Sequence, residues 1–422
     1  MKKPFVAADI LLPDASVDLE RWAVLACDQF TSEPAYWQRA AALCEGYPSA
    51  LHITLPEVYL ESPDVKARIG WIRDTMDRYL GTVLTRSLHG FVYVERTTPS
   101  GVRRGLVGAV DLETYSFEPD AAPLCRPSEA TVRERIPPRL AVREGASLET
   151  PHILMLADDA AAPVFPALAA KKGDLPLLYR TPLMLGGGSI EGRAVTDEAL
   201  IAQIESAVAA LADKDAFAKA YPGASVPPFA LAVGDGNHSL ATAKAHWEKV
   251  KAKLSPEEQE THPARYCLAE VCSVHDEALI VEPIHRVIFD ADFDDVLREF
   301  RAFLAKRGDE GDAQTIVLTN GRGARETVGA AGKTHPLAVG TFEAFWAEFS
   351  AAHPAARVDF IHGEESVEKL AREGGAGALM PPFAKSDLFL GVAKGGVLPK
   401  KTFSMGHAEE KRYYMECRRI VK

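Results

Sequence analysis

Positions 234–239 read Gly-Asp-Gly-Asn-His-Ser, a run that combines reactive side chains with residues suited to a tight turn. Glycine and asparagine tolerate positive φ angles more readily than other residues. The Asp235 carboxylate can hold magnesium, act as a base or orient its neighbour. The His238 imidazole can donate to a phosphate oxygen or move a proton near neutral pH. We therefore predict catalytic roles for Asp235 and His238.

The surrounding pattern predicts that this run connects a strand to a helix. Residues 229–233 are an apolar run suited to a buried strand, and Leu240, Ala243 and Trp247 recur at helical spacing. The first N–H groups of such a helix lack intrahelical partners, and the helix dipole adds positive charge there, so phosphate is a natural ligand. The predicted ligand-binding residues of the turn are Gly234, Gly236, Asn237 and Ser239.

A plain structural turn explains the same residues. In that interpretation Asp235 or Asn237 caps the helix and His238 lies on the surface, because turns of this composition are common before helices. The run is not a Walker P-loop, since it lacks the Gly-Lys-Ser/Thr ending, and its glycines are too close together for the dinucleotide fingerprint. The local pattern leaves both interpretations open.

A family resemblance favours the binding site. Gly-Asp-Gly-Asn-His-Ser-Leu-Ala-Thr-Ala resembles the Asp-Gly-His-His-Arg-x-x-Thr-Ala signature of the domain-of-unknown-function 1015 family. Residues 128–131 resemble its His-Glu-x-Thr segment, residues 283–286 its Pro-Thr-His-Arg segment, and residues 398–403 its Met-Pro-x-Lys-Ser-Thr-x-Phe segment. The four segments occur in the family's order and cover almost the whole chain. The family has no assigned reaction, so the resemblance implies a fold and a site.

The family signature is similar to the Gly-x-x-Arg-type motif of the ParB/sulfiredoxin-like fold, found in segregation proteins, sulfiredoxins and a free-serine kinase. In those proteins the turn holds nucleotide phosphates, which implies a nucleotide here, with magnesium as its companion ion. Asn237 stands where the family has its first histidine and where sulfiredoxin has its reactive cysteine, so sulfiredoxin chemistry is excluded. Ser239 replaces the arginine expected to hold phosphate, and a hydroxyl brings no charge.

Other cations must then supply the positive charge. Arg286 follows His285 just after an expected strand at residues 278–281, and Lys400, Lys401 and Thr402 form a second candidate group. Glu129 lies in a long Pro-rich passage, residues 118–139, that suits a lid or an acid/base group. Each has an ordinary alternative: a surface arginine beside a half-buried histidine, solvated lysines, or a loop carboxylate.

Composition limits the partners. The chain has 422 residues, 47% apolar and 25% charged, with a net charge of −11. Nucleic-acid binding needs a basic face, so nucleic acid is not an expected partner. No apolar stretch is long enough for a membrane span and no signal peptide is evident. The cysteines show no tight spacing, which favours a reduced, cytoplasmic protein. The spacing of Cys267, Cys272 and His275 favours buried structural cysteines over a metal site.

The alternation of apolar runs and helical patterns predicts a mixed α+β or α/β fold. Residues 1–290 form a ParB/sulfiredoxin-like domain that carries the turn, and residues 291–422 form a smaller α/β domain with a basic C-terminal segment. Glycines 186–188 predict a hinge or hairpin, and Thr196 is expected to cap a helix reaching residue 211. The sequence selects no oligomeric state.

Two functions fit these expectations. One is a nucleotide-dependent phosphotransferase or hydrolase, in which positioning and charge neutralisation do most of the work. The other is a non-catalytic protein that senses a nucleotide or an acidic metabolite. The missing arginine favours the sensor, and the pair Asp235 and His238 favours the enzyme.

Overall fold

The computed structural model describes residues 2–118, 121–150, 152–160 and 164–422, and the chain divides into two compact units. Unit 1 comprises Met1–Ile280 with Gly406–Lys422, and unit 2 comprises Val281–Met405. The sequence placed the boundary near residue 290 and the C-terminal segment in the second domain. That segment returns to unit 1 instead, because β19 (Tyr413–Tyr414) pairs with β3 (Val24–Leu25), and β20 (Arg418–Arg419) pairs with β7 (Leu148–Glu149).

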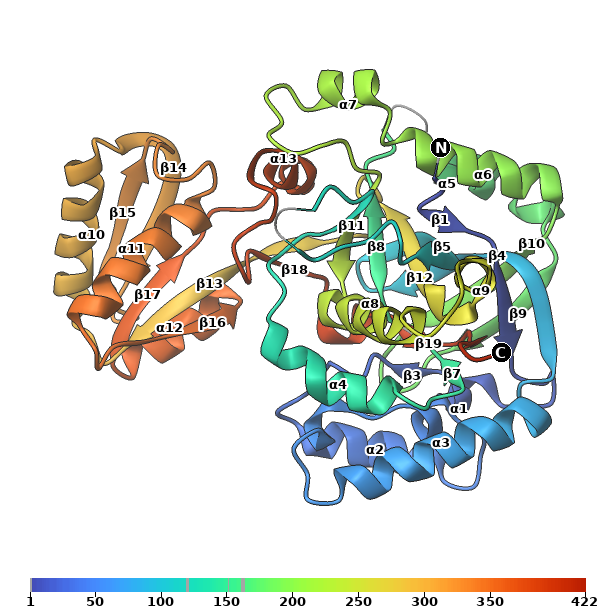
Figure 1. Ribbon diagram of the computed structural model, residues 1–422. Coiled ribbons are helices and arrows are strands. Elements are labelled where there is room, and N and C mark those ends of the chain that lie inside the picture. Colours follow the sequence, from blue (N-terminus) through green and yellow to red (C-terminus); the bar gives the residue numbers. More distant parts are fainter. Residues whose placement is uncertain (1, 119–120, 151, 161–163) are drawn as a thin grey trace. The chain divides into compact units, whose positions relative to one another are not determined.

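Unit 1 is built on a ten-stranded mixed sheet (Figure 1). The strand order is β6-β11-β8-β12-β5-β4-β10-β9, with β1 beside β5 and β2 beside β4. The bounds are β1 Phe5–Val6, β2 Ala8–Leu12, β4 Arg86–Thr98, β5 Gly101–Asp111, β6 Cys125–Pro127, β8 Leu154–Ala157, β9 Leu177–Pro182, β10 Ser189–Val195, β11 Leu231–Asp235 and β12 Tyr266–Ser273. The mixed α/β class predicted from the sequence is confirmed.

Both faces of this sheet are covered. Side chains alternate between the faces of a strand, so Val92 and Val94 of β4 join one hydrophobic core while Phe91 and Tyr93 join the other. The first core packs against α3, and the second includes Trp247 of α8.

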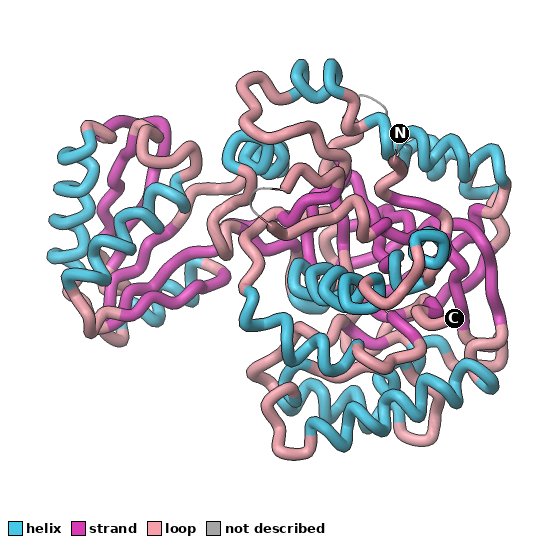
Figure 2. The backbone as a smooth tube through the Cα atoms, in the orientation of Figure 1, coloured by secondary structure: helices cyan, strands magenta, loops and turns pink. Residues whose placement is uncertain are grey.

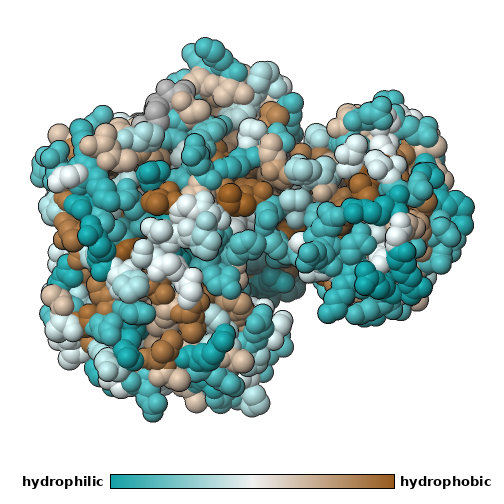
Figure 3. Space-filling model, turned by 180° about the vertical axis from the view of Figure 1, so that it is seen from behind, coloured by the Kyte–Doolittle hydropathy of each residue, from teal (hydrophilic) through white to brown (hydrophobic). Residues whose placement is uncertain are grey.

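Helices surround the strands of unit 1 in the tube view (Figure 2). They are α1 Leu19–Trp22, α2 Pro34–Cys44, α3 Val65–Thr82, α4 Ile136–Arg143, α5 Val164–Ala170, α6 Glu198–Ala210, α7 Lys214–Ala220, α8 Asn237–Lys251 and α9 Pro256–Thr261, with 3-10 turns η1 Ala50–Ile53, η2 Glu57–Tyr59, η3 Arg133–Arg135, η4 Lys172–Asp174, η5 Pro263–Arg265 and η6 Ala408–Glu410. Among the described residues, no helix has the length and apolar character that crossing a membrane requires. On the face drawn in Figure 3, hydrophobic residues form scattered patches among hydrophilic ones.

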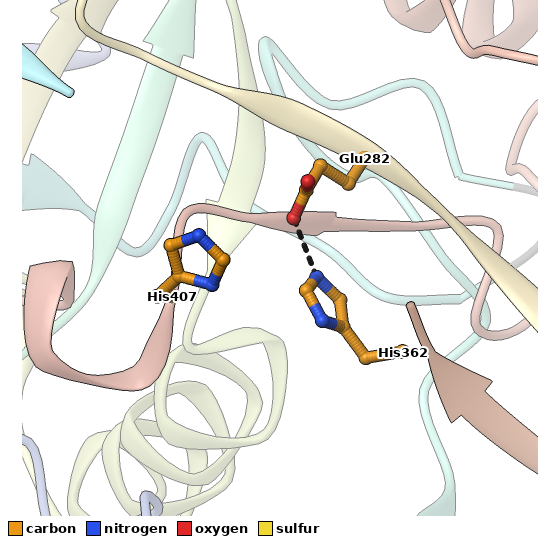
Figure 4. Close-up of side chains that lie close together, drawn as sticks. All are labelled: Glu282, His362 and His407. Carbon is orange, nitrogen blue, oxygen red and sulfur yellow. Dashed lines mark ion pairs between the residues drawn. The ribbon is translucent and has the colours of Figure 1, made fainter. Parts of the chain in front are cut away.

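Unit 2 carries its own mixed layer of strands and helices. Its sheet has the order β15-β14-β17-β13-β16, with β18 beside β13. The bounds are β13 Val281–Phe289, β14 Glu310–Thr319, β15 Arg325–Ala330, β16 Arg357–His362, β17 Gly375–Leu379, β18 Phe403–Met405, α10 Phe293–Arg307, α11 Ala338–Ala352, α12 Glu364–Arg372 and α13 Lys385–Gly395. Phe300, Phe342 and Phe345 pack together in its core. Between β13 and β16, Nε2 of His362 pairs with a Glu282 carboxylate oxygen at 2.6 Å (Figure 4).

Three local predictions need correction. The strand expected at residues 278–281 is wrong, because the strand begins only at Val281 and runs through the whole of β13. The passage 118–139 is not a continuous loop, since it contains β6, η3 and the start of α4; residues 119–120 lie outside the described residues. Asp197 rather than Thr196 caps α6, because its Oδ1 accepts from Leu200 N at 2.8 Å. Glycines 186–188 connect the antiparallel pair β9 and β10, as a hairpin requires.

Candidate functional site

The turn between β11 and α8 has the geometry of an anion-binding helix terminus. Gly236 is the N-cap of α8 and has φ of +81°. The first intrahelical bond runs from Leu240 N to Gly236 O, so three backbone N–H groups precede it at the end of the helix. A Cβ at position 236 would lie 3.1 Å from Ile153 Cα, so glycine is required for both conformation and space. The strand, the turn and the helix occur in the predicted order.

A lysine from the C-terminal segment supplies a cation beside this turn. Asp235 Oδ1 accepts from Gly236 N at 3.0 Å, and its Oδ2 lies 3.1 Å from Lys411 Nζ. Both side chains are largely buried, with 22% of Asp235 and 12% of Lys411 exposed. Lys411 is placed there because it immediately precedes β19, which pairs with β3. The charge that Ser239 lacks is therefore present within unit 1.

A buried polar cluster lies on the other side of the turn. His152 precedes β8, whose first residue Leu154 is opposite Asp235 in the sheet. Its Nε2 lies 3.2 Å from Ser239 Oγ and 3.3 Å from Asp28 Oδ2, and its Nδ1 lies 2.7 Å from Tyr414 Oη.

The cluster holds His152 as a cation. Burial opposes a charge on His152, but the Asp28 carboxylate outweighs burial and raises the pKa of His152 well above its ordinary value. Burial likewise works to raise the pKa of Asp28, yet the charge and hydrogen bond of His152 hold that pKa well below its usual range, with Lys411 contributing further. Nδ1 of the imidazolium then donates to the Tyr414 oxygen.

This arrangement is not a Ser-His-Asp hydrolytic triad. In a triad the serine and the acid contact opposite ring nitrogens, and the neutral histidine takes the serine proton. Here Ser239 and Asp28 both lie beside Nε2, and the protonated His152 has no lone pair with which to accept a proton. The cluster is therefore suited to electrostatic binding, with His152 as a second positive charge near the turn.

The passage after β6 contacts the opposite side of the turn. β6 runs parallel to β11, with Pro127 opposite Val233, which brings the next residues alongside the turn. Asn237 Nδ2 donates to Ser128 Oγ at 3.5 Å, and Val132 N donates to His238 Nε2 at 3.3 Å.

Glu129 lies between those two contacts and is half-buried. The buried Asn237 Oδ1 has no hydrogen-bond partner in the described part of the chain, so the turn holds one unused acceptor.

The remaining predicted site residues lie in unit 2. Arg286 is fully buried, and its guanidinium donates to Glu343 Oε1 at 3.0 Å, to Lys401 O at 3.0 Å and to Lys400 O at 3.2 Å. His285 Nδ1 accepts from Met380 N at 3.0 Å. These contacts give Arg286 and His285 structural roles within unit 2.

The other three residues of that group belong to the segment that Arg286 anchors. Lys400 Nζ lies 5.3 Å from the centre of the Phe360 ring. Lys401 has a positive φ of 55°, and Thr402 Oγ1 donates to Pro399 O at 2.6 Å. Their predicted contact with the ligand remains a prediction.

The cysteines and histidine considered for zinc have separate partners. Cys267 and Cys272 are buried in β12, and Cys272 Sγ donates to Glu270 Oε1 at 3.3 Å. His275 Nε2 lies 2.6 Å from Asp158 Oδ1.

Sequence reasoning missed Asp28, His152 and Tyr414, and it named Lys411 only as part of a basic run. Each follows or precedes a short apolar segment that becomes a strand, and this position was the one available signal. Their convergence depends on the pairing of β3 with β19 and of β8 with β11, which local sequence does not encode.

The signature segments found in sequence order match a family profile over residues 4–417. The chain belongs to the DUF1015 family. The description of that family is "protein of unknown function", so membership assigns no reaction. No curated protein matches this DUF1015 chain.

Several solved structures are distantly similar. A conserved hypothetical protein from Pyrococcus furiosus has 10% identity and a TM-score of 0.35, over 72% of this chain and 92% of that one. A free serine kinase in complex with AMP has 9% identity and a TM-score of 0.36, over 73% and 90%. SbnI from Staphylococcus aureus, with a C-terminal truncation, has 10% identity and a TM-score of 0.35, over 71% and 82%. Similarity this low carries no argument about fold or ligand.

Proposed function

We propose that this DUF1015 protein binds a nucleotide or another phosphate-bearing small molecule at the turn formed by residues 234–239. The observation that carries the proposal is the contact of Lys411 with Asp235 at the glycine-capped end of α8. Helix N–H groups, a lysine and the imidazolium of His152 are the donors that phosphate oxygens bind.

The charges of the site argue for a magnesium-bound ligand. Lys411 and His152 carry two positive charges, and Asp235 and Asp28 balance them, so the cluster has no surplus positive charge. A bare phosphate must compete with carboxylates for the same cations. Magnesium supplies the missing charge, since it is usually held by substrate phosphates and one or two carboxylates.

The residues present accept such an ion in one way. Both oxygens of Asp235 are engaged, one with Gly236 N and one with Lys411. A magnesium ion at Asp235 therefore releases Lys411, which becomes available to the phosphate. Asn237 Oδ1, buried and without a partner among the described residues, offers a further oxygen.

We infer a catalytic form and a binding form of this function. In the first, the protein is a nucleotide-dependent phosphotransferase or hydrolase, with Asp235, His238 and Glu129 in acid, base or metal-binding roles. In the second, it senses the nucleotide or an acidic metabolite without turnover.

The strand, glycine turn and helix also support our inference that unit 1 is related to the ParB/sulfiredoxin-like fold. All six cysteines carry free thiols, which supports a cytoplasmic location.

Calorimetric titration with ADP tests the proposal. We expect binding in the presence of magnesium, weaker binding after chelation, and no binding of adenosine, which lacks phosphate. Equal affinity for ADP and adenosine would overturn the proposal, because the turn would then contribute nothing. Absence of binding to ATP, ADP, GTP and inorganic pyrophosphate with magnesium would overturn it as well.

A further inference from the structure

Unit 1 contains a cavity of about 150 Å³ that borders Ser239 and His152. Its walls are largely apolar, with Ile53, Leu55, Leu60, Met76, Val142 and Leu148 among them. A cavity of this volume with apolar walls accommodates a molecule the size of benzene. The phosphate site described above does not use this space.

The charged side chains along the cavity are already paired with one another. Arg139 binds Glu57 through two guanidinium nitrogens, with Nε 2.7 Å from Oε1. Arg143 donates to Glu149 Oε2 at 2.6 Å. A charged ligand would enter a largely apolar space without a free counter-ion and would lose its hydration. The cavity therefore favours an uncharged ligand.

Polar groups along the same walls favour an oxygen atom on that ligand. Arg143 Nε is buried and has no hydrogen-bond acceptor among the residues that the structure describes. Ser239 and Tyr414 bring hydroxyl groups to the cavity. A ligand hydroxyl can accept from a buried N–H and also donate to a hydroxyl oxygen, whereas a hydrocarbon leaves these groups unused.

We propose that this cavity binds an uncharged molecule with an apolar body of about benzene size and one hydroxyl group. Because Ser239 belongs to both the turn and the cavity wall, this molecule is the second ligand of the site. Only that last assignment rests on the proposed nucleotide function. The preference for an uncharged hydroxyl compound rests on the paired charges and the apolar walls.

Benzyl alcohol, toluene and benzoate are probes of similar size that separate these requirements. Calorimetry and ligand-observed NMR on the full chain should show that benzyl alcohol binds at least about tenfold more tightly than benzoate, because the cavity has no free cation for a carboxylate. Toluene should bind more weakly than benzyl alcohol. Equal binding of benzoate, or no binding of benzyl alcohol, would overturn the proposal.

Cavity-filling variants locate the binding. Val142→Phe should reduce benzyl alcohol binding at least about tenfold by occupying the cavity, whereas Ala141→Phe, at the exposed preceding position of α4, should leave it unchanged. Leu60→Phe gives an independent check from another segment should the first variant unfold, and circular dichroism reports the fold in each case. Binding that survives both cavity variants would overturn the assignment to this cavity.

The two proposals can fail separately. ADP with magnesium should still bind to Val142→Phe, because that residue lies on the cavity wall and not at the turn. Benzyl alcohol binding in a protein that binds no nucleotide would support the cavity site and overturn its assignment as the second ligand of a nucleotide site.

Discussion

Lys411 Nζ lies 3.1 Å from Asp235 Oδ2, so the C-terminal segment supplies the cation that the turn lacks in its own sequence. The arginine position of the family signature holds Ser239, and the compensating charge comes from a strand that pairs at the far end of the chain. This contact makes the source of positive charge a testable feature of the site.

Replacing Lys411 with alanine should weaken binding of ADP with magnesium by about tenfold to a hundredfold. A charge-assisted hydrogen bond to phosphate contributes roughly 1.5–3 kcal/mol, and alanine removes it. Lys249→Ala, on an exposed part of α8, is the matched control and should leave binding unchanged. Lys400→Ala with Lys401→Ala tests the alternative source in unit 2. Loss of binding in that double variant, with normal binding by Lys411→Ala, would contradict the assignment.

Substituting Gly236 with alanine should destabilise the protein by roughly 1–3 kcal/mol. The left-handed conformation alone costs an L-residue about 1–2 kcal/mol, and the new Cβ would press on Ile153. Gly70→Ala is the control, because Gly70 lies inside α3 with open space around it, and alanine there should stabilise the helix by about 0.5–1 kcal/mol. Urea denaturation measures both changes, and equal effects would refute the conformational argument.

The Asp28–His152 pair should make stability depend on pH at both ends of the range. The pKa of His152 is raised in the folded protein, so its contribution is fully present below its ordinary value of 6.5 and is lost as pH rises through the raised pKa. The pKa of Asp28 is depressed, so its contribution is present above its ordinary value of 3.8 and is lost as pH falls through the depressed pKa. The pair therefore stabilises most between about pH 4 and pH 6.5.

Urea denaturation across pH 3–9 checks this window against the double variant Asp28→Asn with His152→Gln. The stability difference between the two proteins should shrink at alkaline pH, by about 1.4 kcal/mol for each pH unit traversed between the ordinary and the raised pKa of His152. A constant difference would show that the pair does not titrate as the geometry requires.

Arg412 should be among the most sensitive residues of unit 1. Its guanidinium lies 2.9 Å from Glu270 Oε2 and 2.6 Å from Glu416 Oε2, and all three side chains are almost completely buried. Arg412→Met would leave two buried carboxylates without this partner and should cost roughly 3–5 kcal/mol in chemical denaturation. Arg301→Met removes an exposed pair with Glu326 and should cost less than about 1 kcal/mol. Similar costs for the two variants would contradict the role of burial.

Asp235→Asn and His238→Ala should distinguish an enzyme from a sensor. If nucleotide binding is retained while turnover is lost, the two side chains act in catalysis, because binding and transition-state stabilisation are then separated. If the parent protein turns over no nucleotide with water or a set of phosphoryl acceptors, the sensor remains. His238 Nε2 accepts a hydrogen bond from Val132 N, so its substitution also tests whether this contact orders the passage after β6.

The sequence by itself determined the turn and most of the elements around it. Apolar runs, helical spacing and the Gly-Asp-Gly-Asn pattern are local signals, and they placed β11, Gly236 and α8 in the correct order. The same local signals defined the mixed α/β class and most of the strands of unit 2, although they put the strand before His285 in the wrong place.

Only the tertiary structure decided which residues share the site. Asp28, His152 and Lys411 lie far apart in sequence, and strand pairing brings them to one end of α8. The same pairing returned the C-terminal segment to unit 1, while Arg286, predicted to serve the ligand, holds the backbone of its own unit. Local periodicity reports which face of an element is buried, but partner choice between strands depends on packing of the whole chain, and so does the charge of His152.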